Sequence, residues 1–339
     1  MTWLLIAALL SSLTSVNSFT FGFFNHWHCI GITKNIDLAR PYRFNIGELP
    51  LVLWKDDEKY LSTINICRHL GSTLDQGKLV NGTLLCPYHG LKHDKKQSYG
   101  EIVDYQGRLW WSHNPVKKLP HSIPFYNKGG YVTQHLQIDM NAGLKDCAYN
   151  SMDLHHPEFV HMGLLGFGSS IPPSNVRTIK YNDRVGLEFD YHIKSNIRVI
   201  SSEMSMTRRV KYTKNFNMFI NPTVAWSKVS VDNGSKNLII YVSMLPLKKD
   251  VTRWFVSVHH NFNKNNALQK YILKTATRLI LNQDYKQFNK MYPNNDIKDA
   301  STFHFMLKHD KPIEGVKDLL HNYAYPDVKL CADFIKMTI

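Results

Sequence analysis

The sequence predicts an α+β protein of two domains, and three observations support this prediction. Short strand-like segments separated by turn residues fill the chain from Phe24 to about Phe125. A connector follows, marked by Pro115, Pro120 and Pro124. Beyond it, alternating apolar strands lead to one long helical segment. We therefore expect an all-β domain over residues 24–125 and an α+β domain over 126–339, in which an antiparallel sheet carries a long C-terminal helix.

The strands of the all-β domain are expected where apolar and β-branched residues run between turn signals. Asn81-Gly82 is typical of a two-residue hairpin turn, because both residues tolerate positive φ. The expected strands cover 51–54, 60–66, 79–80, 84–85 and 109–111.

The second domain is expected to begin with a helical stretch around Ala142 to His161. Its clearest strand places apolar residues from Val185 to Ile193 opposite polar ones. Further strands are expected over 218–220, 238–244 and 254–258. From about 266 to 291 the pattern is helical, and its apolar face is expected to hold Leu268, Ile272, Leu279 and Ile280.

The chain is strongly basic. Of its 339 residues, 41 are Lys or Arg and 27 are Asp or Glu, which gives a formal net charge of +14. The basic residues are scattered, without the runs or aromatic-basic motifs typical of nucleic-acid binding. We therefore expect no nucleic-acid partner, and the charge suits an acidic protein such as a small electron carrier.

The N-terminus resembles a targeting segment. No residue from Thr2 to Asn25 is charged, and the residues from Trp3 to Leu10 are apolar. Val16 and Ser18 are small enough for a signal cleavage site before Phe19, so residues 1–18 are expected to be a targeting segment. The alternative is a retained anchor, through which the chain would associate with a membrane.

Two pairs of metal-binding residues stand out in the first domain. The five cysteines are odd in number and widely spread, so they do not indicate a disulfide framework. Cys67-Arg-His69 is followed, after a 16-residue gap, by Cys86-Pro-Tyr-His89. Two thiolates can hold one iron while two imidazoles hold the other. The alternative is a zinc site. Zinc fingers, however, pair Cys with Cys and His with His, whereas here each half is a Cys followed closely by a His. This difference favours a two-iron cluster over a zinc ion.

This C-x-H and C-x-x-H pattern resembles the Rieske domain family. The resemblance implies one [2Fe-2S] cluster bound by Cys67, His69, Cys86 and His89. Respiratory-complex members carry an additional cysteine in each loop, where this sequence has Ser72 and Tyr88. The chain is therefore similar to the ferredoxin and oxygenase type.

A second candidate metal site follows the connector. His156 and His161, with Asp153 three residues upstream, supply the residue types of the facial triad of non-haem Fe(II) oxygenases. On a continuous helix two residues five apart lie ~140° apart, and such histidines are more often structural. Their place downstream of a Rieske motif favours the metal site.

The segment from Asn150 to His161 resembles the N-x-x-D-x-x-H-x-x-x-x-H motif of the ring-hydroxylating Rieske oxygenases. The resemblance implies that His156 and His161 bind a mononuclear Fe(II), and that Asn150 supports them. It also implies that Asp153 bridges this iron to the cluster of the next subunit in a homotrimer. Substituting Asp153 by alanine is then expected to keep both metals and abolish coupled turnover.

The third iron ligand is expected on the long helix. Leu281 to Phe288 resembles the matching segment of the family, and Asp284 is the position that corresponds; Asp296 and Asp299 are weaker competitors. The resemblance implies a helix-grip, START-like catalytic domain. Two local features favour the O-demethylase and pheophorbide a oxygenase-like branch of this family: His89-Gly-Leu91 and the segment after Phe159.

The expected activity is that of a terminal oxygenase. Such an enzyme uses O2, with electrons from a ferredoxin or ferredoxin reductase, to hydroxylate or demethylate a hydrophobic cyclic substrate, aromatic or tetrapyrrole. One alternative is a Rieske electron-transfer protein fused to a ligand-binding domain, and an alternative substrate is a sterol-like lipid. His259 and His260 could line the substrate cavity, but structural histidines are commoner.

Location bears on the substrate. An iron-sulfur protein suits a plastid or a membrane surface better than secretion, and the N-terminus is similar to the leaders that target plastids in algae with secondary plastids. A location in a plastid would favour a tetrapyrrole substrate. An anchor that faces the cytosol would favour a sterol-like lipid. Regiochemistry and the choice between mono- and dioxygenation depend on pocket shape, which the motifs do not specify.

Overall fold

The structure is a computed structural model, which describes residues 22–162, 164, 174–191, 213–220, 222–231, 234–261, 267–291, 311–321 and 328–338. The predicted targeting segment, Asp296 and Asp299 lie outside the described residues. None of the helices within these ranges is long and apolar enough to span a membrane. The chain divides into two compact units. The first runs to His121 and includes Leu245–Lys249 and the residues from His321.

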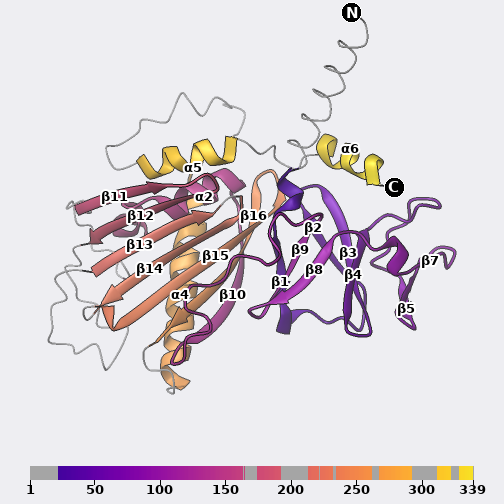
Figure 1. Ribbon diagram of the computed structural model, residues 1–339, viewed down its shortest axis with the longest axis horizontal. Coiled ribbons are helices and arrows are strands. Elements are labelled where there is room, and N and C mark those ends of the chain that lie inside the picture. The colour runs from indigo at the N-terminus through magenta and orange to yellow at the C-terminus, as the bar shows by residue number, and fades with distance from the viewer. Residues whose placement is uncertain are drawn as a thin grey trace, which may run out of the picture. The chain divides into compact units, whose positions relative to one another are not determined.

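The first unit is built from three antiparallel sheets of three strands each (Figure 1). Their strand orders are β1-β9-β8, β2-β3-β4 and β5-β6-β7. The strands are β1 (His28–Ile32), β2 (Tyr42–Ile46), β3 (Leu49–Asp56), β4 (Lys59–Ile64), β5 (Lys78–Val80), β6 (Thr83–Leu85), β7 (Lys92–His93), β8 (Glu101–Tyr105) and β9 (Arg108–Ser112). Short 3-10 helices are η1 (Gly22–Asn25), η2 (Thr33–Asn35) and η3 (Lys95–Gln97), and helix α6 (Val328–Thr338) packs against β3.

The predicted hairpin joins β5 to β6. Asn81 and Gly82 have φ values of 49° and 72°, which suit the tight turn that the sequence predicts. The Trp54 indole donates a hydrogen bond to the Gly82 carbonyl at 3.1 Å, so the turn is held to β3. Buried apolar side chains fill the space between these strands: Val52, Trp54, Leu61, Leu74 and Leu84.

One antiparallel sheet of seven strands in the order β10-β16-β15-β14-β13-β12-β11 lies in the second unit, apart from the last residues of β15, which belong to the first (Figure 1). The strands are β10 (Val132–Met140), β11 (Ser174–Lys180), β12 (Arg184–Tyr191), β13 (Thr213–Ile220), β14 (Val224–Val231), β15 (Lys236–Lys248) and β16 (Val251–His260). The helices are α2 (Leu144–Met152), α3 (His156–Val160), α4 (Ala267–Phe288) and α5 (Lys311–His321). The α+β prediction is confirmed.

Helix α4 presents a buried stripe to the rest of its unit. It contains neither Pro nor Gly, and it packs against β10 and α3. Its buried residues recur every three or four positions: Leu273, Thr277, Leu281, Asp284 and Phe288. The Phe288 ring meets Trp254 of β16 edge-on, with centroids 6.4 Å apart. Asp284 therefore occupies a position that the helical period turns toward the core.

Two expectations about helices are wrong. Leu268 and Leu279 are exposed, because the buried stripe of α4 includes polar Thr277 and Asp284 and is not its most apolar face. The helical stretch over 142–161 is also two helices, with a break after Met152. Pro157 lacks an N–H, and its ring would clash with the carbonyl of residue i−4, so α2 cannot continue through it.

Candidate metal centres

Two loops of the first unit carry the four residues of the Rieske motif. The loop after β4 contains a turn in which the Gly71 N–H donates to the Cys67 carbonyl, and in the loop after β6 the Gly90 N–H donates likewise to the Cys86 carbonyl. Both glycines have positive φ, 76° and 70°, which a tight turn around a metal-binding residue demands. The two loops are therefore built alike.

The thiols and the imidazoles gather as separate pairs. Both thiols are buried, and they interact with each other. The rings of His69 and His89 are exposed, with centroids 4.9 Å apart. The two Cys and two His do not gather around one point as the ligands of a single ion would. Among the described residues, three possible ligand atoms lie within 4.8 Å of one another only at His156, His161 and Asp284 of the second unit. A two-iron cluster, with Cys on one iron and His on the other, fits this arrangement better than a single zinc ion.

Backbone amides point at the sulfur atoms. Burial acts to raise the pKa of the Cys86 thiol, but the N–H groups of Tyr88 and His89 hold this pKa below its usual value. Burial raises the pKa of Cys67, against the opposing effect of the His69 N–H. Amides directed at sulfur stabilise negative charge there, which is the environment that cluster-binding thiolates need.

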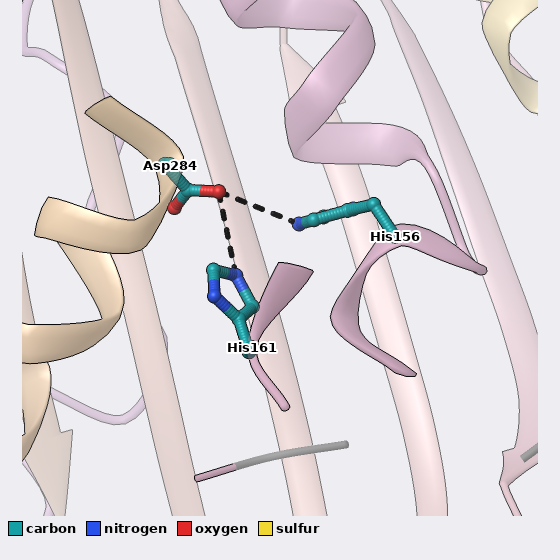
Figure 2. Close-up of side chains that lie close together, drawn as sticks. All are labelled: His156, His161 and Asp284. Carbon is teal, nitrogen blue, oxygen red and sulfur yellow. Dashed lines mark ion pairs between the residues drawn. The ribbon is translucent and has the colours of Figure 1, made fainter. Parts of the chain in front are cut away.

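In the second unit, three side chains distant in sequence meet at one point. Figure 2 shows the Asp284 carboxylate of α4 facing the rings of His156 and His161. Asp284 Oδ1 lies 3.8 Å from His156 Nε2 and 3.4 Å from His161 Nε2. All three ligand atoms lie within 4.8 Å of one another. Two imidazoles and one carboxylate gathered in this way match the donor set of non-haem Fe(II) sites.

Burial favours the neutral form of all three groups, which for the imidazoles is the form that binds a metal. It raises the pKa of Asp284 to about 7, although Asn150 acts to lower it. It also lowers the pKa of His161 to about 4, helped by the neighbouring His156, whose own pKa is likewise lowered by burial. Both imidazoles are thus neutral at neutral pH and can each offer a lone pair. The donor set therefore fits a divalent cation.

Asp153 lies at the break between α2 and α3 and contacts His156 in two ways. Its backbone carbonyl lies 3.1 Å from His156 Nδ1. Its Oδ1 accepts the N–H groups of His155 and His156 at 2.8 and 3.2 Å, so the side chain also stabilises the N-terminus of α3. The Asp153 side chain is 32% exposed and remains accessible from outside the chain.

The other predicted site residues are placed as follows. Asn150 Nδ2 lies 3.5 Å from Asp284 Oδ1, beside the triad. His259 Nδ1 lies 2.8 Å from Thr133 Oγ1, and its ring stacks on Tyr131 at 4.6 Å, which are structural contacts. The sequence reasoning missed Gln283, whose Oε1 lies 3.2 Å from His161 Nδ1. The available signal was its position next to Asp284 in α4.

Known proteins share this organisation. Dicamba O-demethylase oxygenase component of Stenotrophomonas maltophilia is 28% identical over 162 residues, 40% of this chain and 47% of that protein. Chloroplastic pheophorbide a oxygenase of Arabidopsis thaliana is 34% identical over 177 residues, 42% of this chain and 33% of that protein. The chain thus matches less than half the length of these curated relatives.

Solved structures share the fold over almost the whole chain. Dicamba monooxygenase bound to 3,6-dichlorosalicylic acid aligns with a TM-score of 0.74 at 15% identity, covering 92% of this chain and 98% of that chain. A Rieske-type domain followed by an antiparallel-sheet domain whose helices carry a site of two histidines and one carboxylate defines the class of Rieske non-haem iron proteins.

Within that class, the chain belongs to the vanillate O-demethylase oxygenase family. The model of the Vanillate O-demethylase oxygenase C-terminal domain matches residues 140–324, more than half of the chain. The model of the Rieske [2Fe-2S] domain matches residues 26–108. The resemblance to Rieske oxygenases of the O-demethylase and pheophorbide a oxygenase-like branch is therefore confirmed.

Proposed function

We propose that this chain is the terminal oxygenase component of a Rieske non-haem iron oxygenase. It would hydroxylate or oxidatively demethylate a hydrophobic cyclic substrate with O2, using electrons from a ferredoxin or ferredoxin reductase. The convergence of His156, His161 and Asp284 carries the proposal, because an electron-transfer protein has no need of a second metal site.

The candidate metal ligands form two separate sites. Cys67, His69, Cys86 and His89 would hold the cluster, and His156, His161 and Asp284 would hold the iron. When bound, these groups supply one-electron transfer and oxygen activation. Three protein ligands would leave open positions on such an iron, which is the donor set that non-haem Fe(II) oxygenases use.

We further propose a homotrimer in which Asp153 lies between the iron of one subunit and the cluster of the next. Exposed apolar side chains support this arrangement. Leu70 and Tyr88 adjoin the cluster histidines, and Phe159 and Met162 adjoin the iron ligands; each is more than half exposed. Exposed apolar residues beside both sites suit contact with another copy of the chain. Sedimentation equilibrium should give three chains per particle, whereas a monomer would contradict the arrangement.

Iron content and EPR of anaerobically purified, dithionite-reduced protein test the proposed function. The expected result is about three irons per chain and a rhombic cluster signal with average g near ~1.9. About two irons with the same signal, unchanged by added Fe(II), would favour an electron-transfer protein and contradict the oxygenase. With iron established, O2 uptake in the presence of a ferredoxin can be screened against aromatic, tetrapyrrole and sterol substrates.

A further inference from the structure

Two consecutive residues of α4 face the two nitrogens of one imidazole. His161 Nε2 lies 3.4 Å from Asp284 Oδ1, and His161 Nδ1 lies 3.2 Å from Oε1 of Gln283. The His161 side chain is only 4% exposed, so neither nitrogen relies on bulk water. The ring is therefore held between a candidate metal ligand and a neutral amide.

The Gln283 amide has a defined orientation. Its Nε2 lies 3.5 Å from the Met162 carbonyl oxygen, which can only accept a hydrogen bond. The NH2 group must therefore face Met162, which leaves Oε1 facing His161. Because an amide oxygen also only accepts, His161 Nδ1 must carry the proton. Its Nε2 then keeps the lone pair that faces Asp284.

We propose that Gln283 is a positioning residue of the mononuclear metal site. It holds His161 in the tautomer that presents Nε2 to the ion, and it ties the residue after His161 to α4. The proposal rests on the proposed function only in requiring that a metal binds at the triad. His156 receives the equivalent support from the Asp153 carbonyl, which side-chain substitution does not remove. Gln283 is therefore the part of this arrangement that mutation can test.

Three variants of the full-length protein separate the possible roles. Gln283→Leu removes both hydrogen-bonding groups. Gln283→Glu keeps an oxygen that accepts from Nδ1. Gln287→Leu is the control, because Gln287 is exposed one turn further along the same helix. After selective removal of the mononuclear iron, Co(II) is titrated in and followed by its visible absorption. Gln283→Leu should weaken Co(II) binding about 10- to 100-fold, while the Glu and control variants bind as the wild type does.

Proton NMR of the Co(II) protein reads the tautomer directly. The wild type should show two exchangeable hyperfine-shifted N–H resonances, from Nδ1 of His156 and of His161. In Gln283→Leu the His161 resonance should be lost to exchange with water while the His156 resonance remains. A merely structural role for Gln283 would not affect one histidine selectively.

Each outcome decides the proposal. Wild-type Co(II) affinity and both resonances in Gln283→Leu would overturn it. If that variant does not fold, Gln283→Met decides, because its longer side chain also lacks both hydrogen-bonding groups: weakened Co(II) binding with loss of the His161 resonance supports the proposal, and wild-type affinity with both resonances overturns it. If the wild-type protein binds no Co(II) at the triad, the proposed oxygenase function fails as well, and that result is distinct from failure of the Gln283 variants alone.

Discussion

Substituting Asp153 should separate two roles that its carboxylate combines. Oδ1 accepts the N–H groups of His155 and His156, so the side chain stabilises α3 as well as facing outward. Losing a side-chain acceptor at a helix N-terminus costs about 0.5–2 kcal/mol, and Asp153→Ala should destabilise the second unit by an amount in this range. Asn and Asp rank equally at helix N-termini, so Asp153→Asn should cost little stability while it removes the charge.

Urea unfolding, iron content and turnover together measure these effects. Asp153→Asn should keep about three irons per chain and near wild-type stability, yet lose coupled turnover with a ferredoxin. Asp153→Ala should lose turnover and also unfold at a lower urea concentration, so it is the less informative variant. Wild-type turnover in Asp153→Asn would refute the bridging role. Equal stability of the two variants would refute the role of the carboxylate at the start of α3.

Three more predictions follow from single residues. His161→Ala should lower the iron content by about one per chain and leave the cluster EPR signal intact, and loss of the signal would contradict separate sites. Burial lowers the pKa of His28 to about 3. The folded unit therefore loses on the order of 1 kcal/mol of stability per pH unit as the pH falls from 6.5 toward 3, and urea unfolding at pH 7.5 and pH 5 should show a smaller loss in His28→Gln. Leu84→Ala should cost about 2–5 kcal/mol in thermal or urea unfolding, because Leu84 is fully buried beside Cys67 and Cys86; an unchanged midpoint would contradict that packing.

The sequence allowed the first unit to be predicted in outline, because its strands are short and bounded by strong turn signals. Segments 51–54, 60–66 and 109–111 coincide with or overlap β3, β4 and β9. The strands that were not predicted are β1, β2, β7 and β8 in the first unit and β10, β11 and β14 in the second. The pattern of β11 is irregular because it is an edge strand, with most of its residues partly or fully exposed and a shift in register between Ser174 and Arg177.

The exposed face of α4 shows where reasoning from apolar residues fails. If apolar character alone decided which face of α4 is buried, Leu268 and Leu279 would belong to the core. Both side chains are at least half exposed. The buried stripe instead includes Thr277, whose hydroxyl donates to the Leu273 carbonyl at 2.8 Å and is thereby satisfied. It also includes Asp284, a carboxylate whose burial makes sense only beside the two histidines. A polar residue at a core position was thus the strongest sign of function in this helix.

The end of α3 between the two histidines explains why their spacing could not reveal the site. Helix α3 ends at Val160, and His161 leaves the helix with φ −97° and ψ 32°. The angle expected between residues of a continuous helix therefore does not apply, and both rings turn toward α4. The geometry depends on Pro157, which prevents α2 from continuing, and on Asp153, whose carboxylate satisfies the amides that the break exposes. The motif therefore encodes a backbone shape as well as a set of ligands. Asp284 completes the site from more than 100 residues away, so only tertiary packing brings the triad together.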